Sequence, residues 1–463
     1  MAAWKMHTPS GMSDIMPGEC AKKREVENTL WSVFASFGYR EVEMPMFEYY
    51  DVYAGSDGQI SRGLEQESMF KFFDEQGRIL ALRPEMTTSI ARMAATKTEG
   101  IPLPLRFCYT GSVFRAERTY GARQREFTQS GIELIGADSP KADAEVIAAA
   151  IEALIAIGIK EFHMEIGQVA FFNGLTEQAG LDAEDVESLR ERIDSKDRFG
   201  IKELTEKLDI DDSIKKLMIE LPYLFGGAEV LERADVPGLN ATSRAALANV
   251  RSIYETLVGY GLEKFVSIDL GMLQSIDYYT GSIFKCYTHG IGFPICAGGR
   301  YDHLMQKFGR KLGAVGIAFG VNHILTVLRG SESHAFSADV PGTLVYAEDG
   351  ADALCYDLAF NLRVNGCMVE SYVGDGDWHD AEEYAEKSHA ECMIRVFADG
   401  KMLIKDFKRG EIIETTTDDF LEYYDGDDDD CGCGHDHEHD EGCDCGHHHH
   451  DDCGCGHEHG ERR

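Results

Sequence analysis

Three strand candidates follow one another between residues 78 and 136, and their connections limit the folds that this chain can adopt. They are residues 78–84, 105–117 and 126–136, and only a polar loop separates the last two. Strands joined by a short loop pair antiparallel, whereas parallel strands need a long crossover. With helices gathered elsewhere in the chain, the pattern predicts an antiparallel sheet flanked by helices, which is the α+β class.

Two helices are predicted around these strands. Residues 18–37 carry apolar side chains at helical spacing, and Gly38 can adopt the left-handed conformation that ends a helix. Residues 39–45 then alternate like a strand that ends at a proline. Pro140 opens a second helix, which we expect to end at Gly158.

The chain is long enough for more than one domain. From about residue 175 to 260 the pattern becomes helical and charged, which predicts a helical insertion. A Ser/Gly-rich stretch, residues 330–338, is typical of a linker, and strand-like and helical runs alternate after it. We predict a first domain over residues 1–332, a small α/β domain over 339–420 and a tail over 425–463.

The chain is acidic, with a formal net charge of −36. Its tail alone, residues 425–463, holds 14 acidic residues against two arginines. An acidic surface opposes nucleic-acid binding, which depends on Lys and Arg releasing counterions from phosphates. No run of roughly 18 apolar residues or N-terminal signal core is present, so we expect a cytoplasmic protein with no membrane partner.

Six of the 13 cysteines lie in the tail, where Cys-x-Cys-Gly-His occurs three times amid further histidines. Thiolate and imidazole ligands together favour Zn, Ni or Cu. A Gly/Asp-rich segment cannot form a packed core, so we expect disorder until metal binds. The predicted metal ligands are Cys431, Cys433, His435, Cys443, Cys445, His447, Cys453, Cys455 and His457.

Several blocks resemble the motifs of histidyl-tRNA synthetases. Residues 274–281 (Gln-Ser-Ile-Asp-Tyr-Tyr-Thr-Gly) and 297–302 (Ala-Gly-Gly-Arg-Tyr-Asp) are similar to that family's histidine-specific blocks, and residues 313–323 to its third class II motif. Residues 114–133 resemble the second motif. Residues 18–45 resemble the first, which forms the dimer interface in that family. The resemblance spans roughly residues 8–325 and implies a class II synthetase-like fold with a homodimer core.

The resemblance also implies a pocket for free L-histidine. A buried zwitterion needs charge partners, and imidazole N–H groups need acceptors. The implied positions are Glu85, Thr87 and Gln129 for the α-ammonium group, Arg115 for the carboxylate, and Glu133 and Tyr279 for the imidazole, with Tyr278 also at the site.

The sequence departs from the synthetase pattern at two places that bind the nucleotide in that family. The family has an Arg where this chain has Gln274, and a Glu-Arg pair where it has Asn322-His323. Adenylation develops negative charge on phosphates, and losing one preorganised donor costs about 3–4 kcal/mol of transition-state stabilisation. The pattern therefore predicts a protein that binds histidine but has no catalytic residues.

Proteins of this description exist: the regulatory subunits of ATP phosphoribosyltransferase resemble histidyl-tRNA synthetases and work with a short catalytic subunit in the first step of histidine biosynthesis. The resemblance implies a hetero-oligomer with that catalytic subunit, which needs this chain for activity. It also implies histidine feedback inhibition as an allosteric coupling, no required cofactor and no tRNA partner.

Two alternatives stay open. Residues 339–420 resemble a degenerate anticodon-binding domain, which is compatible with a working histidyl-tRNA synthetase that charges tRNA. The tail is compatible with a metal-buffering protein for which the rest of the chain is a scaffold.

Overall fold

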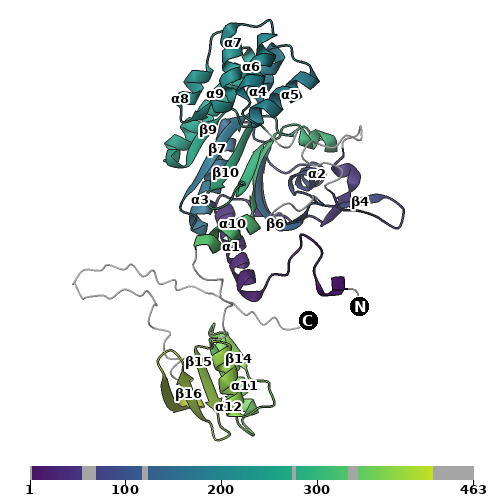
Figure 1. The fold of residues 1–463 in the computed structure, drawn as a ribbon. Helices are drawn as coiled ribbons and strands as arrows, with labels where there is room; N and C mark the ends of the chain where they lie inside the picture. Colours follow the sequence, from purple (N-terminus) through teal and green to yellow (C-terminus); the bar gives the residue numbers. More distant parts are fainter. Residues whose placement is uncertain (1–2, 55–68, 117–123, 274–277, 332–341, 421–463) are drawn as a thin grey trace, which may run out of the picture. The chain divides into compact units, whose positions relative to one another are not determined.

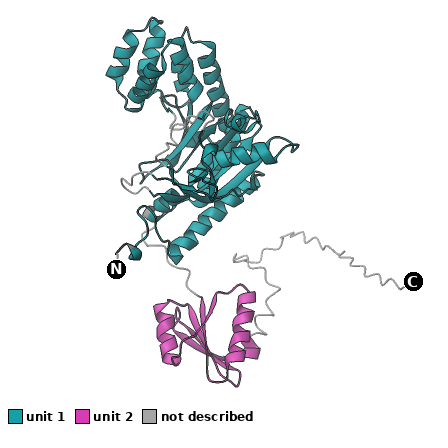
Figure 2. Ribbon diagram, turned by 90° about the vertical axis from the view of Figure 1, so that its right-hand side faces the viewer, with its two compact units in different colours: residues 1–339 teal, residues 340–463 magenta. Residues whose placement is uncertain are grey.

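The computed structural model describes residues 3–54, 69–116, 124–273, 278–331 and 342–420. The chain divides into two compact units, residues 1–339 and 340–463, each of which is described by itself (Figure 2).

The first unit is built on a nine-stranded sheet in the order β1-β5-β6-β12-β11-β10-β7-β9-β8. Its neighbouring strands pair antiparallel, except that β1 with β5 and β7 with β9 are parallel. The predicted α+β class is therefore confirmed. The strands are β1 (Arg40–Glu41), β5 (Leu105–Phe114), β6 (Glu126–Ile135), β7 (Phe162–Gln168), β8 (Phe225–Gly226), β9 (Val266–Asp269), β10 (Ser282–Thr288), β11 (Cys296–Arg300) and β12 (Ala314–Gly320).

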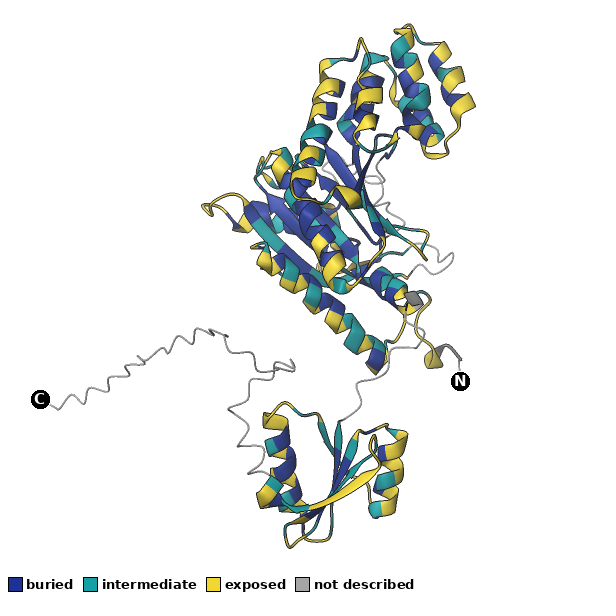
Figure 3. Ribbon diagram, turned by 90° about the vertical axis from the view of Figure 1, so that its left-hand side faces the viewer, coloured by how far each residue is buried: buried dark blue, intermediate teal, exposed yellow. Residues whose placement is uncertain are grey.

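Helices cover one face of this sheet and enclose the main apolar core. Ile132 of β6 and Phe319 of β12 point into this core, which Leu30 of α1 and Ile147 of α3 also enter. Figure 3 shows the buried strands beneath these helices. The covering helices are α1 (Pro17–Ser36), α3 (Pro140–Ile157), α9 (Ala241–Gly259) and α10 (Val321–Ser331).

Local sequence sets the ends of two of these helices. Helix α3 has Pro140 in its first turn, where a missing backbone N–H costs nothing, and Gly158 ends it with φ of +94°. Gly38 follows α1 with φ of +83°. Only glycine adopts this left-handed conformation readily, and both predicted ends are confirmed.

A helical segment interrupts the sheet between β7 and β9 and forms the upper part of Figure 1. Its apolar side chains, including Leu189 and Leu217, join the main core. The helices are α4 (Val169–Gln178), α5 (Ala183–Asp194), α6 (Arg198–Glu206), α7 (Asp212–Glu220) and α8 (Glu229–Ala234).

The opposite face of the large sheet has a smaller cover. Helix α2 (Thr87–Lys97) packs there through Met86 and Ile90 against Tyr109 and Ile135. A three-stranded sheet precedes α2 in the chain, in the order β2 (Phe47–Tyr49), β4 (Ile79–Leu82) and β3 (Lys71–Phe73) (Figure 1). This second face is therefore only partly covered by helix, and it carries the candidate site.

The second unit is a small α/β domain with helices on both faces. Val345 and Ile394 pack against α11, whereas their neighbours Leu344 and Met393 pack towards α12. Adjacent strand residues point to opposite faces, so the two helices lie on opposite sides of the sheet. The sheet order is β14 (Val369–Ser371), β13 (Thr343–Ala347), β15 (Cys392–Val396), β16 (Lys401–Asp406) and β17 (Glu411–Thr416), with α11 (Asp352–Val364) and α12 (Trp378–Lys387).

Within the described ranges, no helix combines the length and the apolar character that crossing a membrane requires.

Candidate functional site

The candidate site lies on the face of the large sheet that α2 partly covers. The strand register places Glu133 of β6 beside Gly316 of β12, and Gly316 beside Gly299 of β11. Gln129 and Gly131 share the face of Glu133, because alternate residues of a strand point the same way. Helix α2 begins over this row at Thr87. The row and the start of α2 together form the candidate site.

Glu133 is the centre of the site and is almost completely buried. Its Oε1 atom accepts a hydrogen bond of 2.8 Å from the Thr87 hydroxyl, and its Oε2 atom accepts one of 2.5 Å from the Tyr301 hydroxyl. Burial raises the pKa of Glu133 to about 8, and the nearby Glu85 carboxylate adds to the rise, although the two hydroxyl donors oppose it. Glu133 is therefore mainly a neutral carboxylic acid at pH 7.

Glycines let the polar side chains lie directly on the sheet. A Cβ atom at Gly316 would come within 1.7 Å of Glu133 Oε2, and one at Gly299 would come within 2.8 Å of the Tyr279 ring. A Cβ atom at Gly131 would lie 2.6 Å from the Tyr109 hydroxyl. These distances are shorter than carbon contacts allow, so larger residues at these positions would displace the site.

Glu85 lies at the start of α2 and is also buried. Its carboxylate accepts from the backbone N–H of Thr88 at 3.0 and 3.2 Å, which satisfies a donor that the helix itself cannot. Burial raises the pKa of Glu85, while the Arg115 guanidinium opposes that rise. Arg115 stacks 5.2 Å from the Phe127 ring and donates from Nε to the Pro84 carbonyl at 3.2 Å.

Three tyrosines form one wall of the site. The Tyr278 ring lies 4.9 Å from that of Tyr279 and 5.8 Å from that of Tyr301. Burial, followed by the charge of Glu133, raises the pKa of Tyr279, so its hydroxyl stays a neutral donor. Tyr301 was not predicted as a site residue, although it directly follows the Gly-Gly-Arg sequence of the second histidine-specific block.

Two polar atoms of the site lack a hydrogen-bond partner within the described part of the chain. They are Gln129 Oε1 and the Tyr109 hydroxyl, and neither has appreciable contact with solvent. Buried polar atoms of native proteins are almost always paired, and an unpaired one costs about 1–3 kcal/mol. An acceptor and a hydroxyl facing the same row as Glu133 fit a ligand that carries hydrogen-bond donors.

A buried ion pair supports the row from the opposite face. Arg300, the residue before Tyr301, donates from Nη2 to Asp143 Oδ2 of α3 at 2.7 Å and from Nη1 to the Ala137 carbonyl at 3.0 Å. The Ser282 hydroxyl also donates to Asp143. Arg300 thereby ties β11 to α3 beneath the site.

The other end of the face lies at the start of α10. There, Asn322 and His323 stand where the synthetase family has a Glu-Arg pair, so the arginine of that pair is missing. The His323 ring lies 4.3 Å from the Phe293 ring and stacks nearly parallel to Phe127 at 6.4 Å. Burial lowers the pKa of His323, so its imidazole is neutral at pH 7. Asn322 is engaged with the backbone, because its Oδ1 accepts from the Thr128 N–H at 2.8 Å.

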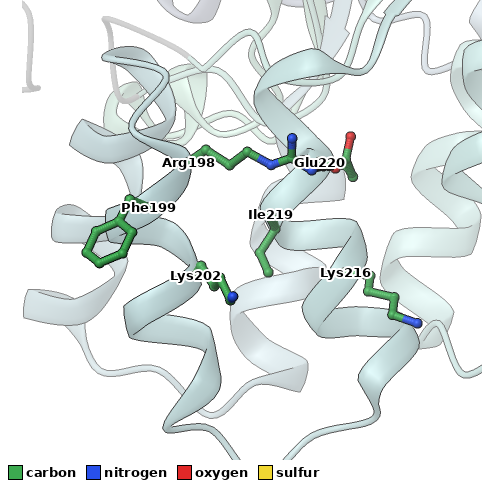
Figure 4. A pocket seen from close by; sticks show the side chains of 6 residues that line it. All are labelled: Arg198, Phe199, Lys202, Lys216, Ile219 and Glu220. Carbon is green, nitrogen blue, oxygen red and sulfur yellow. Dashed lines mark hydrogen bonds and ion pairs between the residues drawn. The ribbon is translucent and has the colours of Figure 1, made fainter.

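A surface pocket of about 640 Å³ lies elsewhere, between α6 and α7 of the insertion (Figure 4). Arg198 reaches across it to pair with Glu220, and Phe199 points away from the helix pair. Its lining residues are Arg198, Phe199, Lys202, Lys216, Ile219 and Glu220. None of them was predicted to bind a ligand, and the pocket is separate from the Glu133 site.

Comparisons with known proteins agree with this geometry. A family model described as histidyl-tRNA synthetase matches residues 11–324. A solved structure of an ATP phosphoribosyltransferase regulatory subunit/histidyl-tRNA synthetase from Bacillus halodurans is 30% identical, with a TM-score of 0.73 over 84% of this chain and 98% of that one. The histidyl-tRNA synthetase of Nostoc sp. PCC 7120, at 21% identity and a TM-score of 0.74, covers 91% of this chain and 99% of that one and shares the fold.

The fold and the matched region define a protein of the histidyl-tRNA synthetase-like class. The ATP phosphoribosyltransferase regulatory subunit of Acetivibrio thermocellus is 43% identical over 91% of this chain and 100% of its own length. That of Ruminiclostridium cellulolyticum is 38% identical over 91% of this chain and 99% of its own. This chain belongs to the family of ATP phosphoribosyltransferase regulatory subunits, and the resemblance expected from its motifs is confirmed.

The structure brings most of the expected histidine-binding residues together. Glu85, Thr87, Glu133, Tyr278 and Tyr279 lie together at the start of α2, with Arg115 at the edge towards Phe127. Gln129 lies four residues before Glu133 on the same face of β6, in register with Gly320. The Thr87 hydroxyl is engaged by Glu133, whereas the expectation gave it to the ligand ammonium group. Gln274 and all nine predicted metal ligands of the tail lie outside the described residues.

Proposed function

We propose that this chain is the histidine sensor of an ATP phosphoribosyltransferase, required for the activity of a short catalytic subunit and inhibited by free L-histidine. The family fixes the regulatory class, and the chain does not turn over substrate itself. The observation that carries histidine sensing is Glu133, a buried carboxyl held by two hydroxyls. The same face carries Gln129 Oε1 and the Tyr109 hydroxyl, which have no hydrogen-bond partner among the described residues.

The chemistry of the site suits each part of the ligand. An imidazole N–H would donate to Glu133, and the α-ammonium group would donate to Glu85 and Gln129. Arg115 would meet the carboxylate with a guanidinium that already stacks on Phe127. The imidazole N–H and the ammonium group supply donors to Glu133 and Glu85, two carboxyls that burial disfavours as anions, so binding would offset part of the cost of burying their charge.

The end of the face near His323 supports a regulator over a synthetase. Neutral His323 sits between Phe127 and Phe293 and brings no positive charge to a nucleotide phosphate. Feedback then amounts to a coupling free energy between histidine here and substrates on the catalytic subunit, typically 1–3 kcal/mol. We place this complex in the cytoplasm, with a homodimer of this chain at its core and the second unit serving assembly.

The test is phosphoribosyl transfer by the short catalytic subunit mixed with this chain. We expect wild type to support activity that histidine inhibits. Glu133→Gln should support the same activity with half-inhibition shifted to at least tenfold higher histidine, about 1.4 kcal/mol. Histidine-dependent pyrophosphate exchange from ATP by the purified chain would instead establish the synthetase alternative.

The tail supports a second, separate proposal, metal buffering. Its three Cys-x-Cys-Gly-His repeats supply thiolate and imidazole ligands for Zn, Ni or Cu. A peptide of residues 425–463 should take up Zn or Ni in calorimetry, and failure to do so would remove the proposal. Deleting the same residues should leave histidine synthesis intact, whereas its loss would make the tail part of the regulator.

A further inference from the structure

The same sheet face carries a second polar cluster on β10, β7 and β9. The register pairs Lys285 of β10 with Glu165 of β7, and Glu165 with Ser267 of β9. Asp269 lies two residues beyond Ser267 and shares its face. Lys285 also pairs across β11 with Ala297, which places the cluster on the face of the Glu133 row.

Strand order separates this cluster from the Glu133 site. Strands β12 and β11 lie between β6 and β10, so three strand spacings of about 4.8 Å, or roughly 14 Å, separate the two. The floor between them carries small residues, with Gly131, Ala318 and Ala297 in register. A single histidine bound at Glu133 is too short to fill both positions.

The charged groups of the cluster are close without being paired. Burial raises the pKa of Glu165 and of Asp269, while the charges of Lys285 and Lys196 oppose both rises. Yet within the described ranges no ion pair forms between these carboxylates and these lysines; Asp269 Oδ1 instead accepts from the Gly271 N–H at 2.9 Å. Lys196 lies in the turn between α5 and α6, near enough for its charge to act on both carboxylates.

Ser267 is the independent sign of a ligand. Its side chain is 5% exposed, and its hydroxyl has no hydrogen-bond partner among the described residues. The register places that hydroxyl next to Glu165 on the cluster's face. A buried hydroxyl beside unpaired charges is an arrangement that a polar ligand able to reach all of them would satisfy.

We propose that this cluster is a second binding site for a free α-amino acid, with the ammonium group on Glu165 and Asp269 and the carboxylate on Lys285 and Ser267. The negative charges of the two carboxylates equal the positive charges of the two lysines, so the cluster matches a zwitterion of zero net charge. A phosphate ligand would leave negative charge uncompensated. His163 pairs with Tyr287 beside the charges and gives the ligand side chain a partly apolar wall. This site does not depend on histidine binding at Glu133.

The test is calorimetric titration of the intact chain with each of the twenty standard L-amino acids. We expect at least one of them to saturate a site that Lys285→Gln weakens roughly 10- to 100-fold, as expected for losing a hydrogen bond to a charged group. Ser267→Ala should weaken the same site without lowering the chain's thermal stability. The exposed Lys160→Gln is the matched control and should change nothing.

The Glu133→Gln variant separates this proposal from histidine sensing. Binding that survives Glu133→Gln but is weakened by Lys285→Gln supports the second site, whether or not histidine binds at Glu133. If no amino acid binds in a manner that depends on Lys285, the proposal is overturned. Displacement of the bound amino acid by inorganic phosphate at equal concentration would also overturn it, because the cluster would then select anions.

Discussion

The two ends of the open sheet face differ in whether their polar side chains have hydrogen-bond partners. Near α2, Glu133 is buried with two hydroxyl donors, and Gln129 Oε1 and the Tyr109 hydroxyl on the same face lack partners within the part of the chain that the structure describes. Near α10, His323 and Asn322 are packed against rings and backbone and are already satisfied. Ligand binding is favoured where polar groups lack partners, so of these two ends the α2 end is the one prepared for a small polar ligand.

The largest expected effect tests the scaffold beneath both ends. Arg300→Ala would leave Asp143 buried without its cation, and we expect the free energy of unfolding to fall by about 3–5 kcal/mol. Urea denaturation measures this loss. Arg198→Ala removes an exposed ion pair with Glu220 and serves as control, at about 0–1 kcal/mol. Equal effects of the two changes would refute a structural role for Arg300.

The pH dependence of stability should differ in sign between the ends. The pKa of Glu133 is raised from 4.5 to about 8, so its contribution is fully present below pH 4.5 and is lost as the pH rises through about 8. The slope is at most about 1.4 kcal/mol per pH unit. The pKa of His323 is lowered, so its contribution is present above pH 6.5 and is lost as the pH falls.

Glu133→Gln should flatten the stability profile of the ligand-free chain between pH 5 and 8, as measured by urea midpoints. His323→Gln should flatten it only on the acid side of pH 6.5. Profiles of wild type and Glu133→Gln that run parallel throughout would contradict the buried, neutral carboxyl.

A single added methyl group should weaken histidine binding at the α2 end selectively. Gly316→Ala places a Cβ atom against Glu133 Oε2, and we expect overpacking to cost about 1–3 kcal/mol of histidine affinity. Gly259→Ala, in α9 with open space around it, should leave histidine affinity unchanged and serves as control. Calorimetric titration with L-histidine measures both. Unaltered binding by Gly316→Ala would mean that histidine does not use Glu133.

The smallest expected effect on histidine affinity comes from a substitution at the α10 end. His323→Ala should change histidine affinity by less than about 0.5 kcal/mol, as a substitution away from the ligand does. The same titration measures it. A loss as large as that of Gly316→Ala would show that the α10 end also holds the ligand.

Local sequence determined much of the fold. Helix α3 begins at Pro140 and ends before Gly158 because of the backbone preferences of these two residues. Such preferences act within three or four residues, so the limits of the helix could be predicted. Strand β17 was not predicted, because it lacks the alternation of buried apolar and exposed polar residues that marks a strand. Its two isoleucines, Ile412 and Ile413, are adjacent and both exposed. The main sheet required long-range pairing that periodicity alone does not specify.

The motif resemblance named candidate site residues but not their contacts, and their binding of histidine stays a prediction. The resemblance suggested Glu85 and Glu133, and the structure places both at the start of α2. The bond from Tyr301 to Glu133 joins residues 168 positions apart, and no spacing rule reveals it. The Lys285 cluster was missed for the same reason, since its members lie on three strands that become neighbours only in the folded sheet.

The most direct test is a sequential calorimetric titration of the purified chain, first with L-histidine and then with ATP and Mg²⁺ in the same cell. A saturable heat for histidine followed by none for ATP is the predicted result. Strong ATP binding on the histidine-loaded chain, or the absence of any histidine heat, would contradict a pocket that recognises the amino acid without activating it.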